Sequence, residues 1–264
     1  MKAIEELIES SRKIVVKIGS HAVSDEAGHV NREAMRSIVD QMNQWMKRGK
    51  RVIIVSSGAG ICGIAAINKW RRKDDIHYKQ ALCSIGQVEL MMLYKEFFAE
   101  HGIHVGQILL SADDFENPVR NLHIRNTLFT LVDEGVVPII NENDSVSVDE
   151  IKIGDNDTLS ALTANLWGAD LLILLSDING IYDKNPKIDP EARLIQTVMD
   201  IDRLEKQIDM NGTSAFGTGG AITKIAAARS VNRMGIPMIM ANGTKMDILS
   251  HLESGQETGT VFLP

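Results

Sequence analysis

Short acids and amides gather at two neighbouring places in the sequence, where they could form one binding site. Residues 141–144 read NEND, residues 154–157 read GDND, and the alternating run at 145–153 between them predicts a β-hairpin. Such residues are common in turns and at helix starts, and one residue of the second cluster could simply cap a helix. They could also bind a small zwitterion, with Asp144 taking an ammonium group and Asn156 a carboxylate or carbonyl oxygen. Both interpretations can hold together.

Two lysines fall at positions where an ammonium group is costly. Lys17 lies within a run that predicts a buried strand, and an unpaired charge there is unfavourable. Lys224 lies in the first turns of a predicted helix, where a cation opposes the helix dipole. A polyanion bound between the lysines explains both positions, and Asp157 could hold both without touching a reacting phosphate. The alternative for each is a lysine whose head reaches solvent at the rim.

Two glycine-rich loops lead from extended structure toward a helix. Residues 56–60 read SSGAG and residues 216–224 read FGTGGAITK. Backbone N–H groups at a helix start favour a phosphate, and glycine lets the backbone approach it. Neither loop matches GxxxxGK[ST] or GxGxxG, so an ordinary turn remains an alternative for each.

The elements that must position these residues alternate between apolar runs and amphipathic stretches. Strands are predicted near 12–19, 51–56, 101–111, 136–143, 169–177, 237–243 and 259–264. Helices are predicted near 31–48, 78–100, 120–134, 156–167 and 200–210, from the second glycine loop to about 234, and briefly after 243. Apolar strands joined by helices predict an α/β fold with a parallel sheet covered on both faces. A change of texture near residue 177 predicts two lobes on one continuous sheet, within a single domain over 1–264.

Composition narrows the class of protein. The 264 residues are 44% hydrophobic, and 28 Lys and Arg against 35 Asp and Glu give a net charge of −7, which argues against nucleic acid as the main partner. No apolar run of about 18 residues predicts a membrane span, and the N-terminus lacks a signal-peptide pattern, so we expect a cytoplasmic protein. Cys62 and Cys83 are expected to be buried thiols in a reducing compartment. The scattered histidines predict no protein metal site.

Several segments, in order along nearly the whole chain, resemble the amino acid kinase family. They are VVKIGS, VSSGA, KQALCSIGQ, HVGQILL, NENDSVSVDEIKIGDND, LLSDINGIYDKNP and GTGGAITK. The NEND…GDND run with a later GTGG…TK is similar to the glutamate-phosphorylating subgroup rather than to aspartate, uridylate or carbamate kinases. The sequence differs from many relatives at Ser176, where they have threonine, and at 57–67, which reads SGAGICGIAAI. Many relatives also continue beyond GTVFLP into an RNA-binding-like PUA domain, so the resemblance implies a short form.

The resemblance implies an αβα sandwich with a mainly parallel sheet, with glutamate bound by residues up to about 175 and ATP by residues 176–264. Lys17 and Lys224 would stabilise the transferred phosphoryl group, and Asp157 would organise them. The implied substrate-binding residues are Ser57, Gly58, Ala59, Asp144 and Asn156. The implied nucleotide-binding residues are Lys17, Gly19, Ser20, Ser176, Asp177, Thr218, Gly219, Gly220, Ala221, Ile222, Thr223 and Lys224.

The implied reaction is ATP-dependent phosphorylation of the γ-carboxylate of L-glutamate to L-glutamyl 5-phosphate, the first step of proline biosynthesis. Mg²⁺ would be held largely by the phosphates. The resemblance also implies a homo-oligomer, a dimer or a tetramer, with possible feedback inhibition by proline. The alternatives are a kinase of the same fold acting on aspartate, N-acetylglutamate or a nucleotide monophosphate, and a sensor that binds an amino acid or nucleotide without turnover.

Overall fold

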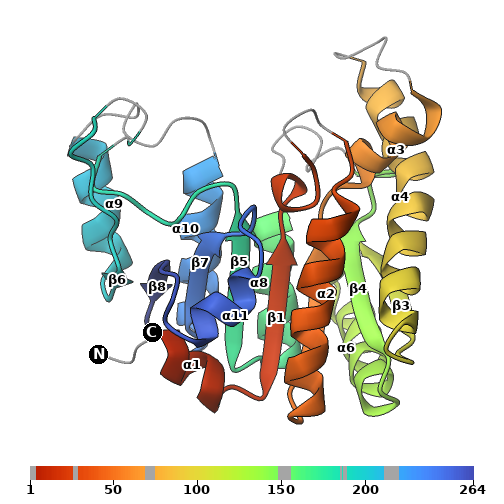
Figure 1. Ribbon diagram of the computed structural model, residues 1–264, viewed down its shortest axis with the longest axis horizontal. Helices are drawn as coiled ribbons and strands as arrows, with labels where there is room; N and C mark the ends of the chain where they lie inside the picture. The colour runs from red at the N-terminus through yellow and green to blue at the C-terminus, as the bar shows by residue number, and fades with distance from the viewer. Residues whose placement is uncertain are drawn as a thin grey trace.

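One continuous sheet runs through the protein (Figure 1). The computed structural model describes residues 4–25, 29–68, 75–147, 156–184, 186, 189–210 and 220–264. Within these residues the sheet has eight strands in the order β3-β4-β2-β1-β5-β7-β8-β6. The strands are β1 Lys13–Ile18, β2 Arg51–Ser56, β3 Val105–Leu110, β4 Val137–Glu142, β5 Leu171–Ser176, β6 Thr197–Val198, β7 Met238–Asn242 and β8 Thr260–Phe262. Every described pair is parallel except β7 with β8, which confirms the predicted fold class.

Helices cover both faces of this sheet. They are α1 Ile4–Ser10, α2 Arg32–Lys47, α3 Ala59–Ile67, α4 Ile76–Ala99, α5 Ala112–Glu116, α6 Pro118–Asp133, α8 Asn156–Trp167, α9 Ile201–Met210, α10 Gly220–Asn232 and α11 Ile248–Glu253, with a 3₁₀ turn at Ser20–Ala22. One apolar core lies under α1, α2, α4 and α11, and a second lies under α6, α8 and α10. The architecture is therefore the expected three-layer αβα sandwich.

Alternation along the central strand assigns its side chains to these two layers. Ile14, Val16 and Ile18 of β1 belong to the first core, and Val15 belongs to the second. Since successive side chains of a strand point to opposite faces, Lys17 lies on the same face as Val15, toward α8 and α10.

Local signals explain several of the boundaries. Asn31 caps α2, because its side chain accepts a hydrogen bond from the Ala34 N–H at 3.0 Å. Asn117 caps α6, whose first residue is Pro118, a residue suited to a first helical position. The sequence did not predict α1, α5 or the two-residue β6, which are too short to show a clear period.

Strand β3 differs from the expectation that both faces of every strand are covered. It lies at the edge of the sheet, and most of its residues are at least partly exposed. Most of the hairpin expected at 145–153 lies outside the described residues, as do residues 216–219 of the second glycine loop. No helix in the described part of the chain is both long and apolar enough to cross a bilayer.

Candidate active site

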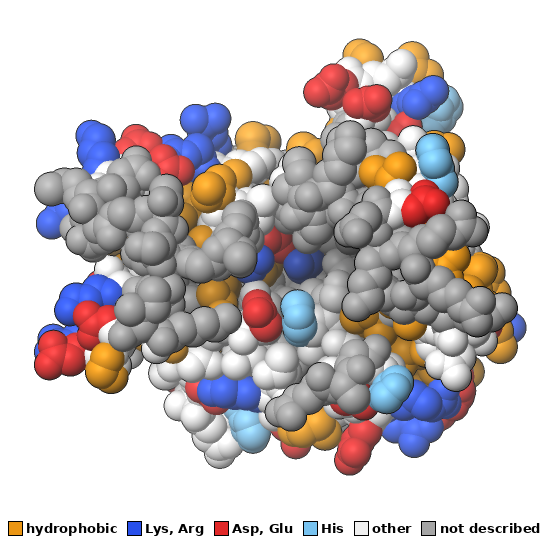
Figure 2. All heavy atoms as spheres, turned by 90° about the horizontal axis from the view of Figure 1, so that it is seen from above, with side chains coloured by type: hydrophobic (Ala, Val, Ile, Leu, Met, Phe, Trp, Pro, Cys, Tyr) orange, Lys and Arg blue, Asp and Glu red, His pale blue; other side chains and the backbone are white. Residues whose placement is uncertain are grey.

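The candidate residues come together at the carboxyl ends of the central parallel strands. Lys17 lies near the end of β1 and pairs in register with Val55 of β2 and Leu174 of β5. Ser57 follows β2, and Ser176 ends β5. Figure 2 views this side of the molecule and shows basic and acidic side chains together in a central hollow. Ligands of open α/β sheets bind in this position.

Two lysines converge on one buried carboxylate at these strand ends. Lys17 Nζ lies 2.7 Å from Asp157 Oδ1, and Lys224 Nζ lies 3.0 Å from Asp157 Oδ2. Thr223 Oγ1 also donates to Asp157 Oδ2, at 3.1 Å. Lys17 is 5% exposed and Asp157 only 1%. The structure therefore joins three residues that the sequence proposed as partners, from β1, α8 and α10.

The charge state of this cluster follows from opposing effects. Burial alone would raise the pKa of the Asp157 carboxyl, but the ammonium groups of Lys17 and Lys224 outweigh burial and lower it. Asp157 is therefore ionised near neutral pH and balances one of the two positive charges. The cluster therefore keeps a net positive charge that can attract an anion.

A network of amide and hydroxyl groups lies beside the charged cluster. Asn156 Nδ2 donates to Ser57 Oγ at 2.8 Å, to the Ser56 carbonyl at 3.2 Å and to Asn141 Oδ1 at 2.9 Å. All four residues are buried. Because protein acceptors engage Nδ2, the amide atom suited to a ligand is Oδ1, which can accept from an ammonium group.

Asp144 supplies a carboxylate in the loop after β4, three residues beyond Asn141. Burial raises its pKa to about 6, and a hydrogen bond from the Cys83 thiol limits the rise. Gln80 Nε2 donates to the Asp144 carbonyl at 3.0 Å, which holds the loop after β4 against α4. Cys62 is buried as expected, whereas Cys83 is only partly buried. The pKa of Asp144 places its ionisation within the range where an enzyme works.

Glycine is required where the chain turns from β2 into α3. Gly58 has φ +108°, and a Cβ there would lie 2.8 Å from Val23 Cγ2. The Ser57 N–H donates to the Ile18 carbonyl at 2.9 Å, so the loop is fastened to the end of β1. Gly58 and Ala59 thus begin α3 beside Ser57, which is the local arrangement that the SSGAG motif predicted.

The expected nucleotide-binding residues lie on the other side of the charged cluster. A Cβ at Gly19 would come within 2.9 Å of the Leu175 carbonyl and 3.7 Å of Lys17 Nζ, so only glycine leaves this space open. Ser20 begins the 3₁₀ turn that follows. Ser176 Oγ donates to Asp177 Oδ1 at 3.0 Å; this bond lowers the pKa of Asp177 although partial burial opposes the effect.

The second glycine loop enters the described structure at the start of α10. Gly220 begins the helix, Ala221 is buried, and Ile222 is 73% exposed. Thr223 and Lys224 turn toward Asp157. Thr218 and Gly219 lie outside the described residues.

Three polar residues support the site: sequence reasoning assigned no role to Gln87 and Tyr94, and it considered Asn141 only as a member of the NEND cluster. Asn141 and Gln87 hydrogen-bond to each other at 2.8 Å, and Tyr94 contacts Ser56 Oγ at 2.8 Å. Gln87 lies within the segment KQALCSIGQ and Asn141 within NEND, so both were inside motifs already noted. Their pairing joins distant parts of the chain, which spacing alone does not reveal.

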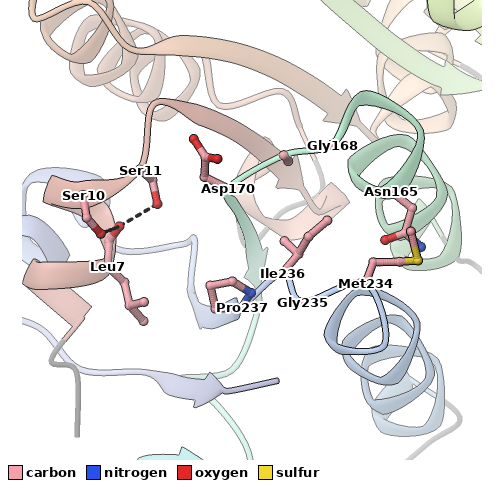
Figure 3. A pocket seen from close by; sticks show the side chains of 11 residues that line it. Leu7, Ser10, Ser11, Asn165, Gly168, Asp170, Met234, Gly235, Ile236 and Pro237 are labelled. Carbon is pink, nitrogen blue, oxygen red and sulfur yellow. Dashed lines mark hydrogen bonds between the residues drawn. The ribbon is translucent and has the colours of Figure 1, made fainter.

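A second hollow, of about 490 Å³, lies at the opposite end of the sheet (Figure 3). Several polar groups along it already serve the fold: Asp170 Oδ2 accepts from the Arg12 and Lys13 N–H groups at 2.9 and 2.8 Å. Ser11 Oγ donates to the Leu7 carbonyl at 2.6 Å. These bonds fasten α1 and the start of β1 to β5, so the carboxyl ends of the strands remain the candidate active site.

Comparison with known proteins identifies the family to which this chain belongs. The sequence pattern of the amino acid kinase family matches residues 12–242. The chain is 56% identical over 259 residues to glutamate 5-kinase of Alkaliphilus metalliredigens, covering 98% of each protein, and 44% identical over 258 residues to glutamate 5-kinase of Geobacter metallireducens, covering 98% of this chain and 69% of that protein. The chain belongs to the amino acid kinase family.

A solved structure agrees with this assignment at the level of the fold. Carbamate kinase from Giardia lamblia bound to AMP-PNP has a TM-score of 0.66 at 15% identity, covering 96% of this chain and 99% of that one. At this identity the likeness concerns the fold alone.

Proposed function

We propose that this protein is a kinase that transfers the γ-phosphoryl group of ATP to the γ-carboxylate of L-glutamate, giving L-glutamyl 5-phosphate for proline biosynthesis. The observation that carries the proposal is the buried Lys17–Asp157–Lys224 cluster directly beside the Asn156–Ser57 network. The glutamate 5-kinases that match over 98% of the chain support the choice of substrate.

The proposed reaction requires the protein mainly to align two anionic reactants and to neutralise the charge on the phosphoryl group. A carboxylate is already a nucleophile, so no general base is required, and the main barrier is the approach of two anions. Lys17 and Lys224 neutralise the charge on the transferred phosphoryl group. Asp157 holds their ammonium groups in place and takes no part in bond making.

The amino-acid side of the pocket recognises a zwitterion. An ionised Asp144 pairs with the α-ammonium group of glutamate, and Asn156 Oδ1 accepts from the same group. Ser57, Gly58 and Ala59 line the start of α3 on the same side. Residues up to about 175 thus serve glutamate, whereas Gly19, Ser20 and the residues of the second lobe serve ATP.

Mg²⁺ would arrive with the nucleotide. Among the described residues no group of three or more His, Cys, Asp or Glu side chains converges as a metal site, and Asp157 is already engaged by two lysines. A cation coordinated mainly by phosphate oxygens suits this arrangement and would add further neutralisation of charge.

We further propose that the protein works in the cytoplasm as a dimer or tetramer and that proline inhibits it. An apolar groove of about 520 Å³ between α4 and the edge strand β3 supports self-association. Val88 and Met92, both 60% exposed, lie along it, and the edge of a sheet offers unpaired backbone groups. Light scattering of the purified protein tests this part, and a monomer at assay concentration would contradict it.

Hydroxylamine trapping tests the reaction. Hydroxylamine converts an acyl phosphate to a hydroxamate and leaves a phosphate anhydride intact, so the assay reports both reaction type and acceptor. The protein is incubated with ATP, Mg²⁺ and either glutamate, aspartate, N-acetylglutamate or UMP. We expect hydroxamate with glutamate, in amounts equal to the ADP formed. Formation of ADP without hydroxamate would mean that the protein is a kinase whose acceptor is not a carboxylate. No turnover with any acceptor would favour a sensor that binds without catalysis.

A further inference from the structure

Gln87 lies on α4, outside every residue proposed to bind a substrate, yet its side chain is joined to the amino-acid pocket. Its Oε1 accepts from Asn141 Nδ2 at 2.8 Å. Asn141 Oδ1 accepts from Asn156 Nδ2 at 2.9 Å, and Asn156 Nδ2 donates to Ser57 Oγ at 2.8 Å. All four side chains are buried, so a hydrogen-bonded chain runs from α4 to two proposed glutamate-binding residues.

Backbone groups fix the direction of every bond in this chain. Asn141 Oδ1 also accepts from the Glu142 N–H at 2.9 Å, and Asn156 Nδ2 also donates to the Ser56 carbonyl at 3.2 Å. A peptide N–H can only donate and a peptide carbonyl can only accept. Asn141 must therefore present Nδ2 toward α4, and only an acceptor on residue 87 satisfies it.

Of the two polar atoms of the Gln87 side chain, only the acceptor oxygen Oε1 makes a hydrogen bond within the described residues. Gln87 Nε2 has no hydrogen-bond partner among the described residues, although the side chain is only 8% exposed. A buried glutamine whose Nε2 is unsatisfied destabilises the fold relative to an apolar side chain of the same length. The hydrogen bond made by its Oε1 must therefore serve a purpose that an apolar side chain could not. The engaged atom is the one that faces Asn141.

We propose that Gln87 is a positioning residue for the amino-acid substrate, an inference that rests on the proposed function. Its carbonyl oxygen holds Asn141, and Asn141 holds the Asn156 amide with Nδ2 toward the protein and Oδ1 as the acceptor for the substrate ammonium group. Without an acceptor at 87, Asn141 Nδ2 is buried and unsatisfied. Asn141 then turns to another partner, and Asn156 loses one of the acceptors that orient it.

The test compares conservative replacements of two buried glutamines. Gln87→Met keeps the length of the side chain and removes the acceptor, and we expect the KM for glutamate to rise about tenfold. The KM for ATP and kcat should stay within about twofold of wild type, because no bond in the chain reaches the lysine cluster. Gln87→Glu retains an acceptor oxygen and should restore most of the affinity for glutamate.

Gln41→Met is the matched control. Gln41 is also buried, on α2, where Nε2 donates to the Ser37 carbonyl and Oε1 accepts from the Ser250 N–H, each at 2.9 Å. This variant should lose stability in thermal unfolding and leave the KM for glutamate unchanged. If Gln87→Met behaves as Gln41→Met does, with lower stability and an unchanged KM, Gln87 is structural and the inference is overturned.

A double-mutant cycle separates this inference from the proposed function. Asn156→Ala alone should raise the KM for glutamate, and Gln87→Met should add little in that background because both act through one amide. An unchanged KM in Asn156→Ala would overturn the proposed pocket itself. A raised KM in Asn156→Ala with additive effects in the double variant would leave the pocket standing and reject the relay through Asn141.

Discussion

Replacing Asp157 by asparagine should destabilise the protein in a way that a nucleotide reverses. Asp157 is the counter-ion for Lys17 at 2.7 Å and for Lys224 at 3.0 Å, and its side chain is almost fully buried. An asparagine keeps one oxygen but turns an NH₂ group toward an ammonium group. Two poorly hydrated positive charges are then left without their partner.

The size of the effect follows from the burial of the cluster. Removing one partner of a buried ion pair costs about 3–5 kcal/mol, because the remaining charge stays uncompensated. In a protein of this size that corresponds to a fall in Tm on the order of 10 °C. Bound ATP brings phosphate charges to the same lysines, so the deficit of Asp157→Asn should shrink when the nucleotide site is saturated.

Thermal unfolding with and without Mg²⁺ and a non-hydrolysable ATP analogue measures both quantities. The matched control is Asp170→Asn at the opposite end of the sheet, where Asp170 Oδ2 accepts two backbone N–H bonds. Its deficit should be the same with and without nucleotide. A deficit in Asp157→Asn that nucleotide leaves untouched would show that the carboxylate serves the fold rather than an anion site. No deficit at all would refute the reasoning from burial.

Three further outcomes test the site. Lys17→Ala and Lys224→Ala should each lower kcat about 10²-fold or more with a small change in the KM for glutamate, measured by ADP release; a change confined to KM would indicate ground-state binding. Because the pKa of Asp144 is about 6, kcat/KM for glutamate should rise with pH through that value as the carboxylate becomes ionised, and Asp144→Asn should abolish this limb. Gly58→Ala should cost about 1–3 kcal/mol in denaturant unfolding, and more than Gly49→Ala, where φ is +84° but no atom lies within 4 Å of the added Cβ.

The raised pKa of Asp144 also determines the direction in which this residue makes the free energy of unfolding change with pH. Its folded value of about 6 lies above the ordinary value of 3.8, so the folded protein binds more protons than the unfolded chain between these values. The contribution of Asp144 to the stability of the free protein therefore falls as the pH rises from 3.8 to 6. An ammonium ligand that pairs with the ionised carboxylate should offset this loss, and unfolding midpoints at pH 5 and 7 with and without glutamate would show it.

Local chemistry explains how much of the structure could be predicted. The α8 bounds, Asn156–Trp167, agree with the sequence because short polar residues precede an apolar helix. Lys17 was expected to need a partner because a lone ammonium group in a buried strand is costly. The pairing of Gln87 with Asn141 could not be found in this way, since it depends on how α4 lies against β4. The edge position of β3 likewise follows from strand order, which local periodicity does not encode.

The start of α8 shows why the two halves of the site are held at a fixed separation. Asn156 and Asp157 are consecutive, and on a helix successive side chains point about 100° apart. Asn156 therefore faces the Ser57 network while Asp157 faces Lys17 and Lys224. Because one helical turn carries both residues, the backbone would align an amino acid on one side with a phosphate on the other in the proposed reaction. Alignment of this kind lowers the barrier by paying the entropy of bringing two reactants together in advance, and it adds to the charge stabilisation expected from the two lysines.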